Sequence, residues 1–129
     1  MTSRPGTVRL GMVVIDCPEP AALARFYGGL LGLTATDDDQ DWTTLAGPGY
    51  RLAFQRAEPY HPPKWPDGPP QQFHLDLDVT DPVAAHELAM SLGATPLRPT
   101  TPPDPGQPAA FRVYADPVGH PFCLVRVSS

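Results

Sequence analysis

The sequence predicts an α+β fold in which the order strand, helix, strand, strand, strand occurs twice. The first observation is an internal repeat, because Pro20-Ala21-Ala22 and Leu31-Gly32 recur as Pro82-Val83-Ala84 and Leu92-Gly93 after about 60 residues. The second is that alternating apolar runs and helical spacings follow one another in the same order in both halves. Two halves of this size cannot each bury a full core, so we expect them to share one.

Composition narrows the class of protein. The 129 residues, 41% hydrophobic and 18% charged, suit a single domain over 1–129. Nine Lys and Arg against 14 Asp and Glu give a net charge of −5, which argues against nucleic acid as a partner. We see no apolar run of membrane-spanning length and no signal-peptide pattern, and the two cysteines are too few for a disulfide scaffold. We therefore expect a soluble, cytoplasmic protein without a membrane partner.

Module one covers about 8–56. Its first strand is predicted over 10–15, where the residues are apolar and β-branched, and a helix over 21–31 is expected to end at Gly32. Short strands separated by turn compositions follow at 34–36, 42–45 and 51–55.

A Pro-rich linker over 57–72 separates the modules. Proline removes a backbone donor, so this stretch of the 19 prolines in the chain is predicted to cross the surface as a stiff loop. Its Trp65 is unusual for a passive spacer.

Module two covers about 73–127 and repeats the pattern. Asp81 is the predicted N-cap of a helix over 83–92, with Pro82 at its first position and Gly93 at its end. The strands are predicted at 73–79, 95–98, 110–115 and 122–127.

The strand over 73–79 alternates strictly between apolar and polar residues. Leu75, Leu77 and Val79 share the face that covers the helix, while His74, Asp76 and Asp78 share the other. This second face is either a polar binding site or an ordinary solvent-facing side of a sheet.

The repeat defines four equivalent strand positions. It aligns Met12 with His74, and a second match, between 47–52 and 117–122 at about 70 residues, aligns Ala53 with Cys123. Arg51 and Gln55 lie on the same predicted strand face as Ala53.

Two motifs in this framework resemble the vicinal oxygen chelate superfamily, which includes glyoxalase I, bleomycin-resistance proteins, fosfomycin-resistance enzymes and extradiol dioxygenases. They are Ala-Arg-Phe-Tyr-x-x-Leu-Leu-Gly at 24–32 and Asp-Pro-x-Gly-His-Pro-Phe at 116–122, and the similarity extends from about Val8 to Val127. The stretches at 63–67 and 73–76 are similar to an uncharacterised glyoxalase-like branch. The resemblance implies a curved mixed sheet around a central cup, helices outside, and pairing as a homodimer.

The resemblance also implies where a metal would sit, because metal-using relatives hold a divalent ion at the four positions just derived. Here only His74 is a usual ligand, since Met12 and Ala53 cannot serve a hard ion and Cys123 replaces a carboxylate. We therefore predict no metal and no other cofactor. A divalent or soft metal at His74, Cys123 and Met12 is the alternative.

Two functions follow as hypotheses. The first is a metal-free protein that binds a small organic molecule in the cup, with a neutral or cationic ligand favoured by the acidic side chains. The second is a lyase, isomerase or dioxygenase-like enzyme, in which His74 is a general base or metal ligand and Asp76 orients it. The predicted ligand-binding residues are Met12, Arg51, Gln55, Trp65, His74, Asp76, Phe111 and Cys123.

The remaining candidate residues can be explained by a structural role alone. Trp65 either closes over the cup or packs on the outer surface or a dimer partner. His120 is predicted to brace its Gly-His-Pro turn. His61 and His86 are expected to lie in solvent.

Overall fold

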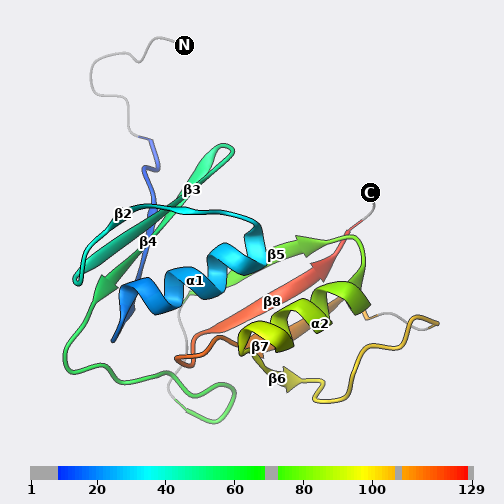
Figure 1. The fold of residues 1–129 in the computed structure, drawn as a ribbon. Coiled ribbons are helices and arrows are strands. Elements are labelled where there is room, and N and C mark those ends of the chain that lie inside the picture. The colour runs from blue at the N-terminus through cyan, green and yellow to red at the C-terminus, as the bar shows by residue number, and fades with distance from the viewer. Residues whose placement is uncertain (1–8, 69–72, 107–108, 128–129) are drawn as a thin grey trace.

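The computed structural model describes residues 9–68, 73–106 and 109–127. Residues 1–8, to which the prediction about a signal peptide refers, and 69–72 of the predicted linker lie outside the described residues. The chain forms two four-stranded mixed sheets, each with one helix (Figure 1). The predicted α+β fold of two βαβββ modules is confirmed.

Module one contains the sheet β1-β4-β3-β2. Strand β1 pairs with β4 in parallel, and the other neighbours are antiparallel. The elements are β1 (Val13–Cys17), α1 (Pro20–Leu31), β2 (Ala35–Asp38), β3 (Trp42–Gly47) and β4 (Tyr50–Arg56).

Module two repeats this topology as the sheet β5-β8-β7-β6, with β5 and β8 parallel. The elements are β5 (Leu75–Val79), α2 (Pro82–Leu92), β6 (Thr95–Arg98), β7 (Phe111–Ala115) and β8 (Pro121–Arg126).

The first strand of each module, β1 and β5, begins later than the sequence predicts. Strand β1 starts at Val13, where its ladder partner Leu52 begins the pairing, and Leu10 is 85% exposed. Strand β5 starts at Leu75 rather than at Phe73, which is 89% exposed. Apolar side chains predict a strand wherever they cluster, but a strand exists only where a neighbour accepts its hydrogen bonds.

The helix boundaries follow their capping residues. Asp81 accepts a hydrogen bond from the backbone N–H of Ala84 at 3.1 Å, as expected for an N-cap. Gly32 and Gly93 end the two helices at φ angles of 73° and 108°, a left-handed conformation that favours glycine. None of the helices in the described residues has both the length and the apolar character needed to cross a membrane.

The two modules share one core. Tyr27 of α1 stacks on Phe54 of β4, with the ring centroids 5.7 Å apart, and also meets Phe122 of β8 edge-on at 6.1 Å. Phe122 in turn stacks on Tyr114 of β7. Helix α1 therefore packs against the helix-facing sides of both sheets, as predicted for halves too small to fold apart.

His86 does not lie in solvent, so that prediction is wrong. It is 9% exposed, and its Nδ1 lies 2.7 Å from the hydroxyl of Tyr114. Burial lowers the pKa of His86, and the nearby Arg112 guanidinium lowers it further. The helix turns this position toward β7, which no local pattern in the sequence indicated.

Candidate functional site

The ladder of module two brings several predicted site residues onto one face. Asp76 lies opposite Cys123 in the β5–β8 pair, and Cys123 lies opposite Val113 in the β7–β8 pair. Phe111 lies on the same face of β7, two residues before Val113. Leu75 and Leu77 point the other way, against the core.

A cavity of about 380 Å³ lies on this face. It is lined by five of the eight residues that are predicted to bind a ligand, and by three apolar residues that the sequence analysis did not single out. The lining residues are Trp65, His74, Asp76, Phe111, Val113, Pro121, Cys123 and Val125. The strand alternation could have identified both valines, because Val113 shares a face of β7 with Phe111 and Val125 shares a face of β8 with Cys123.

Trp65 reaches this cavity from the linker. The guanidinium carbon of Arg98 lies 5.0 Å from the centre of the Trp65 ring, a cation–π distance. Arg98 ends β6 and pairs with Val113, so it extends from the same sheet that forms the cavity. The linker therefore passes beside the cavity and places an aromatic wall there.

The other three predicted residues lie on module one. Arg51 donates from Nε to the carbonyl oxygen of Gly11 at 3.3 Å, and Gln55 pairs with Asp16 and Trp42. Met12 directly precedes β1. The cavity of module two is not lined by Met12, Arg51 or Gln55.

His74, Asp76 and Cys123 form a compact polar group. His74 Nε2 lies 3.1 Å from Asp76 Oδ1, and one ligand atom from each of the three residues lies within 4.8 Å of the others. Burial raises the pKa of the Cys123 thiol to about 11, and the Asp76 carboxylate adds to this shift. At neutral pH the thiol therefore keeps its proton and is a poor nucleophile.

Among the residues that the structure describes, these three form the group of His, Cys, Asp or Glu side chains that could hold a metal ion together. Nitrogen, oxygen and sulfur donors of this kind suit zinc, which would keep an open fourth position for water or substrate. The ion would have to displace the thiol proton and compete with the contact between His74 and Asp76.

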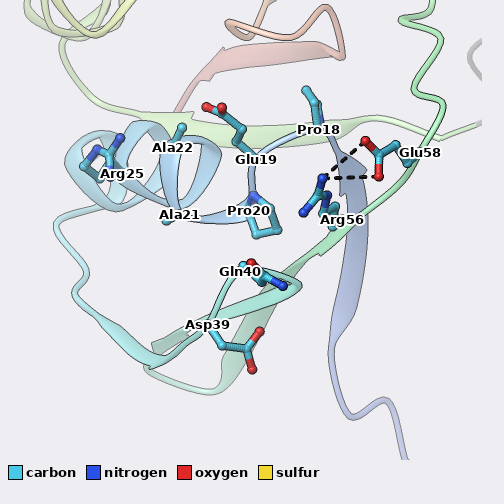
Figure 2. A pocket seen from close by; sticks show the side chains of 10 residues that line it. All are labelled: Pro18, Glu19, Pro20, Ala21, Ala22, Arg25, Asp39, Gln40, Arg56 and Glu58. Atoms are coloured by element: carbon cyan, nitrogen blue, oxygen red, sulfur yellow. Dashed lines mark hydrogen bonds and ion pairs between the residues drawn. The ribbon is translucent and has the colours of Figure 1, made fainter.

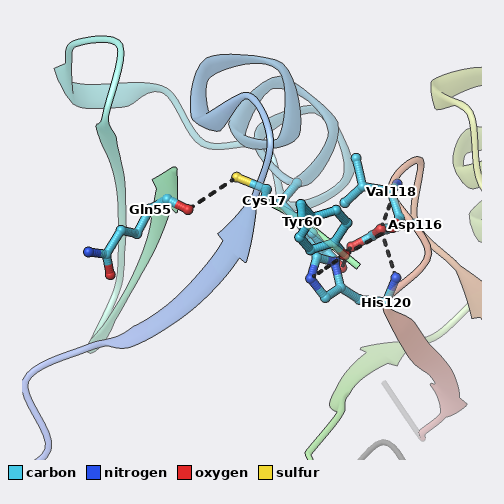
Figure 3. Close-up of polar contacts among 7 residues, drawn as sticks. Cys17, Gln55, Tyr60, Asp116, Val118 and His120 are labelled. Atoms are coloured by element: carbon cyan, nitrogen blue, oxygen red, sulfur yellow. Dashed lines mark hydrogen bonds and ion pairs between the residues drawn. The ribbon is translucent and has the colours of Figure 1, made fainter. Parts of the chain in front are cut away.

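A second polar network joins the modules at the turn between β7 and β8 (Figure 3). The Asp116 carboxylate accepts from the Tyr27 hydroxyl at 2.8 Å and lies 2.7 Å from His120 Nδ1. It also accepts hydrogen bonds from the backbone N–H groups of Val118 and His120. The predicted role of His120 as a brace of this turn is confirmed.

Tyr60 extends this network into the linker. Its hydroxyl donates to the carbonyl oxygen of Val118 at 3.0 Å and lies 3.1 Å from His120 Nε2. Burial raises the pKa of Tyr60, and the Asp116 carboxylate raises it further. The contact ties the linker to module two shortly before Trp65.

The described residues enclose other cavities besides this one. A cavity of about 510 Å³ surrounds the start of α1, where Arg56 and Glu58 form an ion pair at 3.2 Å; Figure 2 shows these side chains. Another cavity, of about 500 Å³, lies between β1 and the start of β5. It is lined by Val13, Val14, Ile15, Asp16, Tyr27, Phe73, His74, Leu75, His120 and Pro121.

Comparisons with known proteins agree with this architecture. The family model described as a glyoxalase-like domain matches residues 12–125. No curated protein matches the sequence.

Several solved structures share the fold. A glyoxalase-related enzyme from Fulvimarina pelagi is 19% identical with a TM-score of 0.67, covering 92% of this chain and 88% of its own. A glyoxalase/bleomycin resistance protein/dioxygenase family enzyme from Burkholderia phytofirmans is 17% identical with a TM-score of 0.69, covering 91% and 97%. A fosfomycin resistance protein from Mesorhizobium loti is 14% identical with a TM-score of 0.68, covering 93% and 92%.

Proposed function

The chain belongs to the glyoxalase-like domain family, and from that premise we propose that it binds a small organic molecule in the cavity of module two. The observation that carries this proposal is the composition of the cavity. Two aromatic side chains, Trp65 and Phe111, line it together with the polar pair His74 and Asp76. A mostly apolar cavity with a few convergent polar groups is the usual form of a small-molecule site.

The charge of the cavity favours a cationic or neutral ligand. Asp76 is an acidic group in the lining, and the chain carries a net charge of −5. The aromatic face of Phe111 in the same lining as the Asp76 carboxylate attracts ammonium and guanidinium groups, whereas Trp65 already carries the Arg98 guanidinium. We therefore expect a phosphonate such as fosfomycin, which is negatively charged, to bind poorly, although a structural relative is a fosfomycin resistance protein.

We propose that binding needs no metal. The thiol of Cys123 is held in its protonated form by burial and by Asp76, and Asp76 is already engaged by His74. Elemental analysis of protein purified without chelator is expected to find no stoichiometric transition metal. One equivalent of metal that disappears in His74→Ala would contradict this expectation.

Trp65 provides the direct test of the binding site. A ligand is first selected by its effect on the melting temperature, and its affinity is then measured by calorimetry. Trp65→Ala should weaken binding by about tenfold or more, as loss of a buried aromatic contact does. Trp42→Ala, a change of the same type on module one, should leave the affinity within about twofold. Equal effects of the two variants would show that the ligand does not contact Trp65.

The contact between His74 and Asp76 supports a second candidate function, proton transfer at a carbon next to a carbonyl. If Nε2–H of His74 donates to Asp76, Nδ1 carries the lone pair and can accept a substrate proton. An enzyme of this kind would exchange that substrate proton with deuterium from solvent, and His74→Gln would abolish the exchange. A binding protein would retain its ligand unchanged and show no exchange.

The homodimer stays a prediction, and light scattering of the purified chain tests it. Exposed apolar side chains such as Leu10 and Met90 are candidates for an interface.

A further inference from the structure

The cavity of module two and the cavity between β1 and β5 share two lining residues, His74 and Pro121. The two spaces, about 380 Å³ and 500 Å³, therefore both border the His74 side chain. Their chemistry differs. The first contains the carboxylate of Asp76 and two aromatic walls, whereas the second is mainly aliphatic along β1.

The apolar surface beside β1 is uncovered in the single chain. Val14 is 41% exposed and Phe73 is 89% exposed, although both are large apolar residues. Together with Val13, Ile15 and Leu75 they form an apolar lobe next to the polar one. Exposed apolar side chains that lie together are a common feature of binding sites.

The polar groups of this second lobe are largely engaged elsewhere. The Tyr27 hydroxyl donates to Asp116, and the two ring nitrogens of His120 lie within hydrogen-bond distance of Asp116 and Tyr60. Of the polar side chains in the lining, this leaves Asp16 and His74, both of which are exposed to solvent. The lobe can therefore accept an apolar chain without leaving buried polar groups unpaired.

From this arrangement we propose that the site has two lobes and takes an elongated amphipathic cation. An aromatic, positively charged head lies beside Trp65, Phe111 and Asp76, and an alkyl body passes His74 and lies along β1 beside Val14. This inference rests on the proposed binding function, and it adds the chemical class of the ligand and the second half of the site.

The test uses benzyl(dimethyl)alkylammonium ions whose alkyl group is methyl, butyl or octyl, with affinity measured by calorimetry below the micelle concentration. The methyl member contains only the head and tests the proposed function. The longer members test the second lobe. Each methylene buried against apolar side chains should tighten binding by roughly three- to fourfold, so butyl should exceed methyl by at least about tenfold.

Val14→Asp should remove this gain and leave the methyl member unaffected, because it places a carboxylate in the apolar lobe and not beside the head. Leu88→Asp on α2 is the matched control, since Leu88 is also 41% exposed and lines neither cavity. It should change no affinity in the series.

The outcomes separate the two proposals. Binding of the methyl member without any gain from chain length would overturn the two-lobed site and leave the proposed function standing. A gain in affinity with alkyl length that persists in Val14→Asp would also overturn the two-lobed site, because the alkyl group of the ligand would then lie elsewhere. Failure of every member, the methyl one included, would overturn the cation-binding cavity and the second lobe together.

Discussion

At the scale of single residues, Cys123 shows how a neighbour sets the chemistry of a site. Its ladder partner is Asp76, so a carboxylate faces the buried thiol. Burial and this negative charge raise the pKa of Cys123 to about 11 from a reference of 9.0. Because the pKa is raised, the protonated thiol stabilises the fold below about pH 9, and this contribution is lost as the pH rises toward 11.

The same shift predicts slow alkylation of Cys123. Removal of the neighbouring charge in Asp76→Asn should lower the pKa and speed the reaction of Cys123 with iodoacetamide at about pH 8 severalfold, because the thiolate fraction rises about tenfold per unit of pKa lowered. Peptide mapping by mass spectrometry measures this rate separately for each cysteine. Cys17, which is buried at the end of β1, provides the internal control and should not respond. A faster reaction at both cysteines would indicate general loosening of the fold.

At the scale of elements, the linker is held at two points. The Tyr60 hydroxyl is hydrogen-bonded to the turn between β7 and β8, and the Trp65 ring contacts Arg98 at the end of β6. Both partners belong to module two, so the linker packs against the module whose cavity it borders. This placement makes Trp65 part of the site and not of an independent spacer.

Tyr60→Phe should therefore destabilise the protein while leaving the core packing intact. The lost hydroxyl removes the hydrogen bond to Val118 and the contact with His120, at a cost of about 1–1.5 kcal/mol in the free energy of unfolding. Urea denaturation measures this cost. Tyr50→Phe removes the same group from a residue that is 41% exposed and should change stability by less than about 0.5 kcal/mol. Equal costs at the two positions would contradict the role given to Tyr60.

At the scale of the whole molecule, the two modules depend on one buried junction. Tyr27 of α1 donates to Asp116 of module two, whose side chain is fully buried, and its ring packs between Phe54 and Phe122. Neither sheet can lose α1 without exposing its own apolar face. The two modules should therefore unfold together.

Single-tryptophan variants test this cooperativity. Trp65→Phe leaves Trp42 as a probe of module one, and Trp42→Phe leaves Trp65 as a probe beside module two. We expect the same urea midpoint from both probes when Tyr27→Phe is added to each, and a loss of about 1.5–3 kcal/mol relative to each parent variant. Separate midpoints for the two probes would show that the modules fold independently.

The sequence by itself determined the fold class, because repeats, capping residues and alternation are local patterns that act within a few residues. Helix α2 began at its N-cap Asp81, and Gly32 and Gly93 ended α1 and α2, where expected. The alternation of the strand around Asp76 also assigned its two faces correctly. Local patterns could not place the ends of β1 and β5. These depend on where β4 and β8 offer backbone partners.

Only the tertiary structure decided how the predicted site residues divide. Alternation assigns a side chain to a face, but it does not say which faces come together across a fold. The cavity of module two therefore gathers Trp65, His74 and Cys123, while Arg51 and Gln55 lie on the other sheet. His86 is buried for the same reason, because the contact that covers it comes from a strand 28 residues away in sequence.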